Sequence, residues 1–209
     1  MKIVVFGATG VTGAEVVRLA LDEGHEVVAI TRNASRFPLA HPRLTVLEGD
    51  ASAHLDVQKS LYGADAIVHC LGIGGMGTGE PTSLVSDSVK VVLAEMEKAG
   101  IRRIVCMSNV GAGKSGSWLY RNLVLPIFLR RLQPIIADKN TMEAALQNSS
   151  AEWVAVRLPN IVAGPEKPVR VDEDGKRIGI SITAASAAKF LVDQTTQSTW
   201  VGKTPSISN

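Results

Sequence analysis

Three glycines near the N-terminus have a spacing that suits the binding of a phosphate group. The segment reads Gly7-Ala8-Thr9-Gly10-Val11-Thr12-Gly13 and follows an apolar run at residues 2–6. Because Gly7 and Gly10 have no side chain, backbone N–H groups can approach a pyrophosphate closely, and a helix that begins here adds partial positive charge. Gly13 lets helix and strand pack tightly. The GxxGxxG spacing therefore predicts a dinucleotide site; the alternative is a tight turn without a ligand.

A second group of residues follows the apolar run at 26–31. An acidic residue here would accept hydrogen bonds from the adenosine ribose of NAD, and none is present. The segment instead contains Arg32, Ser35 and Arg36, whose guanidinium and hydroxyl groups suit a 2′-phosphate. The sequence therefore favours NADP(H) over NAD(H). The alternative is a pair of solvated arginines on a surface loop.

Residues after the third and fourth apolar runs extend the predicted site, because ligands of an open parallel sheet lie across the carboxyl ends of its strands. Asp50 could accept a hydrogen bond from the adenine amino group, or it could cap a helix. Leu71 and Gly72 begin a glycine-rich turn under which the cofactor sugars could fit. These positions predict the adenosine side of the site.

Four residues fall where the nicotinamide ring would lie. Ser108 could orient the carboxamide or bind the electron acceptor, and it is the one candidate catalytic residue; otherwise it is a strand-end serine that satisfies backbone groups. Lys139 could contact the nicotinamide ribose, or it could be an exposed helical lysine. Pro159 and Asn160 follow the sixth apolar run and would close the other side of the pocket.

Apolar runs alternate with segments of helical pattern, which is typical of an α/β fold. Near-continuous Val and Ile runs predict strands that are buried on both faces, at residues 2–6, 26–31, 43–48, 66–70, 103–107 and 152–158. Helices are expected at residues 11–23, 55–61, 81–99, 138–148 and 183–192. We expect a doubly wound parallel sheet, a Rossmann fold, in a single domain over residues 1–209. Residues 169–180 predict a small hairpin that turns at Asp174-Gly175, and a polar tail ends the chain.

The irregular insertion at residues 111–134 could be a lid beside the nicotinamide. Aromatic side chains could stack on a flat acceptor and arginines could attract its phosphate or carboxylates: Trp118, Tyr120, Phe128, Arg121, Arg130 and Arg131. Glycines would let the segment move. The alternative is that its leucines and isoleucines pack or form a subunit contact.

Composition restricts the possible partners. With 22 Lys+Arg against 20 Asp+Glu, the net charge of +2 argues against a nucleic-acid binder. The four histidines are scattered, so no metal site is expected. Cys70 and Cys106 are too few for a disulfide framework, which favours the cytoplasm. Arginines and prolines interrupt the apolar stretch at residues 118–136, so we expect no membrane partner, and a monomer or homodimer that binds a small planar acceptor.

Five parts of the chain resemble the atypical short-chain dehydrogenase/reductase superfamily. They are the loop at 7–13, residues 31–38, Gly49-Asp50, Ser108 and the segment Trp-Val-Ala-Val-Arg-Leu-Pro at 153–159. The resemblance is strongest to its flavin reductase/biliverdin reductase B group, with NmrA-like proteins as neighbours. It implies a Rossmann fold that binds NADP(H) and transfers hydride to a flavin or a tetrapyrrole. It also implies that the cofactor contacts include Gly7, Thr9, Gly10, Thr12, Arg32, Ser35, Arg36, Asp50, Ala51, Leu71 and Gly72. Val11 lies within the same loop and is expected to contribute its backbone.

The chain departs from the Tyr-x-x-x-Lys pair of many short-chain dehydrogenases. Lys139 stands where the lysine belongs, but Ile135 replaces the tyrosine, which disfavours chemistry that needs a phenolic proton donor. Asn160 stands where the flavin reductase group often has a histidine. Reduction of a flavin or quinone by NADPH tolerates these absences. Two functions fit: an NADPH-dependent oxidoreductase acting on a flavin, quinone or tetrapyrrole, and a non-catalytic NmrA-like NADP sensor that acts through a protein partner.

Overall fold

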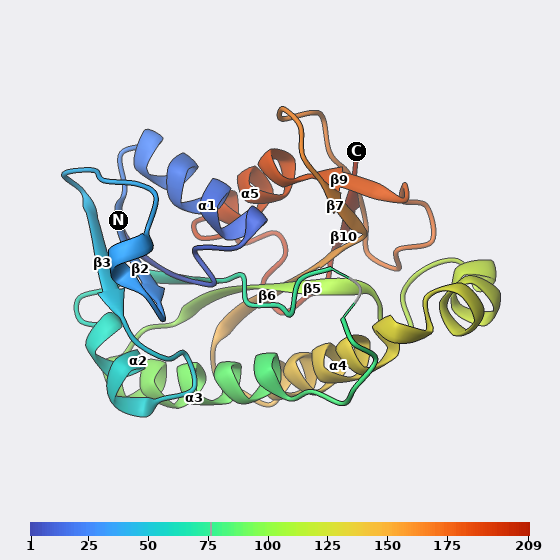
Figure 1. Ribbon diagram of the computed structural model, residues 1–209, viewed down its shortest axis with the longest axis horizontal. Helices are drawn as coiled ribbons and strands as arrows, with labels where there is room; N and C mark the ends of the chain where they lie inside the picture. Colours follow the sequence, from blue (N-terminus) through green and yellow to red (C-terminus); the bar gives the residue numbers. More distant parts are fainter. Residues whose placement is uncertain (76) are drawn as a thin grey trace.

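A computed structural model describes residues 1–75 and 77–209 and shows a mostly parallel sheet between two layers of helices (Figure 1). The main sheet has eight strands in the order β3-β2-β1-β4-β5-β6-β10-β8, and β7 pairs with β9 in a second, two-stranded sheet. The strands are β1(Lys2–Phe6), β2(Glu26–Thr31), β3(Leu44–Glu48), β4(Ala66–His69), β5(Arg103–Gly113), β6(Glu152–Leu158), β7(Asn160–Val162), β8(Arg170–Asp172), β9(Ser181–Thr183) and β10(Ser206–Ser208).

Helices cover both faces of the main sheet. One face carries α1(Val11–Asp22) and α5(Ala184–Asp193), and the other carries α2(His54–Ser60), α3(Leu84–Ala99) and α4(Gln133–Gln147) (Figure 1). Shorter helical segments are η1(Ala34–Arg36), the π-helix η2(Tyr120–Phe128) and η3(Arg130–Leu132). None of the helices in the described ranges is long and apolar enough to cross a membrane. The predicted doubly wound fold is confirmed.

The strand order reverses beside β1. This strand pairs in parallel with β2 on one side, where Val5 lies opposite Ala29, and with β4 on the other, where Val5 lies opposite Val68. The chain thus places β2 and β3 on one side of β1. It then crosses back and places β4, β5 and β6 on the other side. Such a switch point opens a crevice at the carboxyl ends of the strands. The glycine loop that follows β1 lies at this crevice.

The central strands are buried on both faces, which explains their continuous apolar runs. In β1 the side chains from Ile3 to Phe6 are all fully buried. Val5 packs in the cluster under α1 and α5, whereas Val4 and Phe6 pack in the cluster under α2 and α3. Burial of apolar side chains on both faces is the main stabilising contribution that fixes these strands.

Two boundaries differ from the prediction by five residues or more. The strand predicted at 103–107 continues to Gly113, and the helix predicted at 138–148 begins at Gln133, with Pro134 in its first turn where a missing N–H is tolerated. The hairpin at 169–180 is wrong. The chain does turn at Gly175, but β8 pairs with β10, where Val171 lies opposite Ile207, and β9 pairs with β7. The polar tail is also wrong, because Ile207 is buried beside β6.

Gly7 makes the closest approach between the glycine loop and the end of β4. Its φ is +75°, and a Cβ at this position would lie 2.7 Å from the carbonyl carbon of Cys70 and 2.8 Å from the nitrogen of Leu71. Gly24 has a similar φ of +87° but has no atom within 4 Å of its Cβ position. Substitution of these two glycines therefore separates the energetic cost of backbone strain from the cost of steric overlap.

We predict that Gly24→Ala lowers the free energy of unfolding by about 1 kcal/mol, the cost of a left-handed residue with a side chain. Gly7→Ala should cost at least about 1–3 kcal/mol more, since its Cβ overlaps backbone atoms that cannot move aside. Urea denaturation of the two variants measures the difference. Equal losses would show that the loop does not depend on this close approach.

Candidate functional site

The glycine loop gives α1 an amino terminus that is open to a ligand. Gly10 is the N-cap of α1, its N–H donates to the Gly7 oxygen at 3.0 Å, and no side chain caps the helix. The first turn of α1 contains no acidic residue. A Cβ at Gly13 would lie 2.1 Å from the Gly7 oxygen, so only glycine lets α1 pack this closely on the loop.

The loop fits a pyrophosphate by its exposure as well as by its glycines. Thr9, Gly10 and Val11 are exposed, whereas the side chain of Thr12 is buried. The backbone N–H groups of the first helical turn have no intrahelical acceptor, so an anion that accepts from them is stabilised by these groups and by the helix dipole. The predicted contacts of the loop thus lie together at the switch point.

The loop after β2 presents two positive charges. Arg32 and Arg36 are exposed, and neither forms an ion pair or a side-chain hydrogen bond within residues 1–75 and 77–209. Ser35 donates its hydroxyl to Asn33 Oδ1 at 2.8 Å. A Glu48 carboxylate oxygen accepts from the Ala34 N–H at 3.1 Å and orders the same loop. Two unpaired guanidinium groups beside an exposed hydroxyl fit a phosphate group.

The remaining adenosine-side positions lie at the ends of β3 and β4. Asp50 is exposed, and its Oδ1 accepts from the Ser52 N–H at 2.8 Å in a local turn. It does not cap α2, whose N-cap is Ala53, so that alternative is wrong. Leu71 and Ala51 are half-buried and Gly72 is exposed. Contact of these four residues with a cofactor stays a prediction.

Lys139 joins the ends of two central strands from within α4. Its side chain is 1% exposed, and Nζ donates to the Leu71 oxygen at 3.1 Å and to the Met107 oxygen at 2.6 Å. The alternative of an exposed helical lysine is therefore wrong. Burial lowers the pKa of Lys139 to about 8, since desolvation disfavours the charged amine. Its contact with the nicotinamide ribose stays a prediction.

Ser108 belongs to a buried charged network. Its hydroxyl donates to Glu143 Oε1 at 2.7 Å, and Arg157 donates to both oxygens of this carboxylate at 3.0 and 2.6 Å. A Cβ at Gly113 would lie 1.9 Å from Arg157 Nη2, so glycine makes room for the guanidinium. The alternative, in which the Ser108 hydroxyl bonds to backbone groups, is therefore wrong, because the hydroxyl bonds to a carboxylate. The hydroxyl proton of Ser108 is therefore in a hydrogen bond to Glu143. The catalytic role of Ser108 stays a prediction.

Three buried charged residues escaped the sequence analysis. Asp138 accepts from the Val85 and Ser86 N–H groups at 2.9 and 3.0 Å and so caps α3, and Glu143 and Arg157 form the pair described above. Two signals could have found the pair. Lys139 and Glu143 are four residues apart and share one helix face, and an arginine within the apolar run of β6 needs a buried partner.

The nicotinamide side of the site ends at β6. Pro159 is half-buried and follows β6, and Asn160 is exposed and begins β7, which pairs with β9 through Asn160 and Ser181. Both lie at the carboxyl end of β6, next to the middle of β5 where Ser108 is located, because Asn109 and Leu158 are opposite each other in the sheet. The structure therefore brings these three predicted residues to one edge.

The insertion at 111–134 contains the end of β5, η2, η3 and the start of α4. A pocket of about 540 Å³ lies between it and the turn after β4; it is lined by Gly79, Phe128, Arg130, Arg131, Gln133 and Pro134. Three of the predicted acceptor contacts, Phe128, Arg130 and Arg131, thus share one pocket. Trp118, Tyr120 and Arg121 do not line it.

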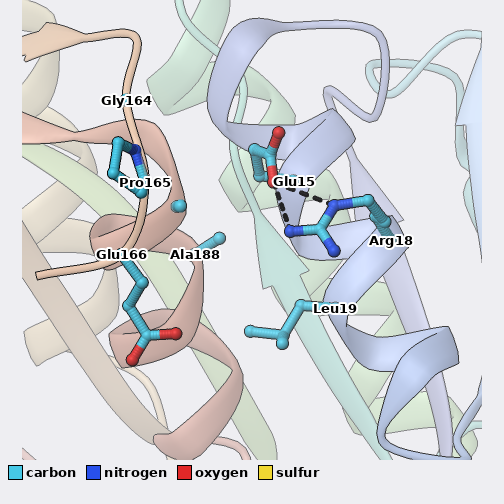
Figure 2. A pocket seen from close by; sticks show the side chains of 8 residues that line it. Glu15, Arg18, Leu19, Gly164, Pro165, Glu166 and Ala188 are labelled. Atoms are coloured by element: carbon cyan, nitrogen blue, oxygen red, sulfur yellow. Dashed lines mark hydrogen bonds and ion pairs between the residues drawn. The ribbon is translucent and has the colours of Figure 1, made fainter.

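A further pocket of about 330 Å³ lies between α1 and α5, next to the loop at 164–166 (Figure 2). Arg18 in its wall is paired with Glu15 at 2.8 Å and with Asp22 at 2.9 Å, so its charge is already satisfied. None of the residues predicted from the sequence to bind cofactor or acceptor lines this pocket. It is separate from the candidate site.

The fold and the open glycine loop define a dinucleotide-binding Rossmann domain, and comparisons with known proteins agree. The sequence profile of the NAD(P)H-binding family matches residues 7–198, so the chain belongs to this family. The photosystem II assembly factor Ycf39 of Guillardia theta is 30% identical over 171 residues, which are 78% of this chain and 48% of that protein. The chain therefore spans about half the length of this curated relative, and still less of the steroid dehydrogenases that it also matches.

Two solved structures share the fold over the full length of the chain. A short-chain dehydrogenase/reductase from Veillonella parvula in complex with NADP has a TM-score of 0.82 at 15% identity, with 94% of that protein covered. ChuY from Escherichia coli O157:H7, described as an anaerobilin reductase, has a TM-score of 0.78 at 22% identity, with 97% covered. The family match thus confirms an NAD(P)H-binding domain, and the two structures confirm the Rossmann fold.

The lowered pKa of Lys139 has a consequence for stability. Between about pH 8 and its ordinary pKa of 10.5, the unfolded chain carries a proton on this amine that the folded chain has released. The free energy of unfolding therefore rises with pH through this window, by up to about 3 kcal/mol. We predict that Lys139→Met, which cannot titrate, loses this rise.

Urea denaturation of both proteins at a series of pH values from about 7 to 10 tests the slope. The variant also loses two hydrogen bonds, so its stability is lower at every pH, and only the difference in slope is informative. Parallel curves for the two proteins would contradict a folded-state pKa below the ordinary value.

Proposed function

We propose that the protein is an NADPH-dependent oxidoreductase that transfers hydride to a planar acceptor such as a flavin, a quinone or a tetrapyrrole. The observation that carries the proposal is the uncapped glycine loop at the switch point, together with the unpaired Arg32 and Arg36 at the end of β2. The loop would hold the pyrophosphate and the two arginines, with Ser35, the 2′-phosphate. The bound cofactor would supply the hydride.

The pocket beside η2 supports a flat, anionic acceptor. Phe128 offers an aromatic face and Arg130 and Arg131 offer positive charge, all within one pocket of about 540 Å³. In this proposal the insertion at 111–134 is the lid that closes on the acceptor and excludes water. The description of ChuY as an anaerobilin reductase agrees with a planar substrate in a protein of this fold.

The state of Ser108 supports an acceptor that needs no proton from the protein. Since its hydroxyl donates to Glu143, only its lone pairs are available to a ligand such as the nicotinamide carboxamide. Flavins and quinones meet this condition, because water can supply the proton after hydride transfer. The free, buried thiols of Cys70 and Cys106 support the cytoplasm as the site of action.

The second candidate is a non-catalytic NmrA-like sensor that acts through a protein partner. It is favoured by the same buried Ser108 and by Ile135 at the position of the usual tyrosine. A sensor would bind NADPH at the site described above but would not turn it over.

We predict that Arg32→Ala weakens NADPH binding by about 1.5–3 kcal/mol, the scale of a hydrogen bond to a charged group, and barely changes NADH binding. Arg102→Ala is the matched control, since this exposed arginine lies just before β5 at the amino-terminal edge of the sheet. Isothermal titration of the native chain and of the two variants with both nucleotides gives the six affinities. Equal losses of NADPH and NADH affinity would remove the assignment of Arg32 to the 2′-phosphate.

Anaerobic oxidation of NADPH, followed at the nicotinamide absorbance, tests the activity itself. We expect turnover only when FMN, a soluble quinone or biliverdin is added, and the acceptor that works best identifies the substrate class. As a matched control, Gly10→Val should fold, since a Cβ at Gly10 meets only the Gly7 oxygen, at 3.3 Å, but should lose nucleotide binding and turnover. Tight NADPH binding without turnover on any acceptor would reject the reductase in favour of the sensor.

A further inference from the structure

The segment at 118–128, which ends in the π-helix η2, exposes five large apolar side chains to solvent. Its hydrogen bonds include the i→i+5 bond from the Leu129 N–H to the Val124 oxygen at 3.1 Å, so side chains five residues apart lie on the same face. Trp118, Leu123 and Phe128 have this spacing and are 74%, 43% and 71% exposed. Leu119 and Ile127 are exposed beside them, at 53% and 59%. We call these five residues the outer face of η2.

The opposite side of η2 makes the contacts that attach it to the domain. A Cβ at Gly111 would lie 3.6 Å from Tyr120 Cε1 and 3.7 Å from Leu125 Cδ2, and the Tyr120 hydroxyl donates to the Val110 oxygen at 3.5 Å. In Figure 1 the segment projects from one end of the molecule, beyond α4. The outer face is therefore not needed to hold η2 in place, and of its five residues only Phe128 lines the pocket described above.

The segment that carries the outer face has charged residues of one sign only. Residues 111–137 contain Lys114, Arg121, Arg130 and Arg131 and no acidic residue. All four are exposed, and none forms an ion pair in the part of the chain that the structure describes. The carboxylate of Asp174, whose backbone oxygen accepts from the Gly116 N–H, is paired with Lys176 at 2.8 Å.

We propose that the outer face of η2 docks on the surface of an anionic lipid bilayer. Tryptophan, phenylalanine and leucine side chains on one face of a helix insert at the headgroup boundary, and arginines beside them pair with acidic headgroups. The sequence predicted no membrane partner because arginines and prolines interrupt the apolar stretch, which excludes a span. The same arginines favour a helix that lies in the plane of the interface.

A second copy of the chain fits this face less well. A symmetric dimer contact would bring the arginines of one η2 close to those of the other, and like charges across an interface are repulsive. An anionic bilayer supplies the opposite charge over the whole surface. The charge pattern therefore selects lipid over self-association.

Co-sedimentation of the full chain with vesicles tests the proposal and needs neither nucleotide nor acceptor, so its outcome is independent of the proposed reductase. We expect binding to vesicles of phosphatidylcholine with phosphatidylglycerol, much weaker binding to phosphatidylcholine alone, and a loss of binding at high salt. Trp118→Ser with Leu123→Ser should lower the partition coefficient at least about tenfold. Arg121→Ala with Arg130→Ala should lower it about 25-fold, from about fivefold for each of the two charges.

The matched control is Leu55→Ser with Tyr62→Ser, which removes exposed apolar side chains at α2 and at the turn after it and should leave binding unchanged. A second measurement does not depend on the folding of the double variant. Brominated lipid should quench tryptophan fluorescence in the native chain, and Trp118→Phe, which keeps the apolar side chain, should bind equally but lose the quenching. The buried Trp153 is an internal reference.

Two results would overturn the proposal. One is a failure of the membrane test, seen either as absence of binding to phosphatidylglycerol vesicles or as equal binding by the η2 and control variants. The other is a dimer by light scattering in the absence of lipid that Trp118→Ser with Leu123→Ser converts to a monomer, which would assign the outer face to a second copy.

Discussion

The candidate site depends on the buried amine of Lys139, which holds the ends of β4 and β5 through two backbone oxygens. A buried lysine is costly unless its protons are donated, and the carbonyls of Leu71 and Met107 are available because the pairing of β4 with β5 stops at His69 and Cys106. On the other side of the β4 end, Gly7 packs against Cys70 and Leu71 so closely that no Cβ fits. The glycine loop, the end of β4 and α4 are therefore fixed together, and the cleft for the cofactor inherits its shape from these contacts.

Helix α4 extends the same principle along its length. Asp138 caps α3, Lys139 joins β4 to β5, and Glu143 joins β5 to β6 through Ser108 and Arg157. These contacts leave little freedom in the floor of the site. Segment η2 is attached differently, since its contacts with the domain lie on one face. The glycine loop thus belongs to a part of the fold that buried contacts hold together, whereas η2 lies outside it.

Much of the cofactor half could be predicted from the sequence because its signals are local. The glycine spacing, the apolar runs and the absence of an acid before Arg32 lie within the first unit of strand, helix and strand. The sequence signals for Glu143 and Arg157 mark each residue as a candidate for a buried pair, but spacing along the chain does not show that they pair with each other. The pairing of β8 with β10 escaped for a similar reason: the two segments are distant in sequence, and Ile207 is the only apolar residue in its strand. The π-helical geometry of η2 could not be predicted, because its apolar residues at 120, 123, 124, 127 and 128 also fit the spacing of an ordinary α-helix.

A crystal structure of the protein with NADPH tests the central claim most directly. The account predicts the pyrophosphate on the N–H groups of residues 7–12, the 2′-phosphate between Arg32 and Arg36, and the nicotinamide at the edge formed by Ser108, Lys139 and Asn160. A nucleotide bound elsewhere, such as the pocket between α1 and α5, or a 2′-phosphate without contact to either arginine, would contradict it.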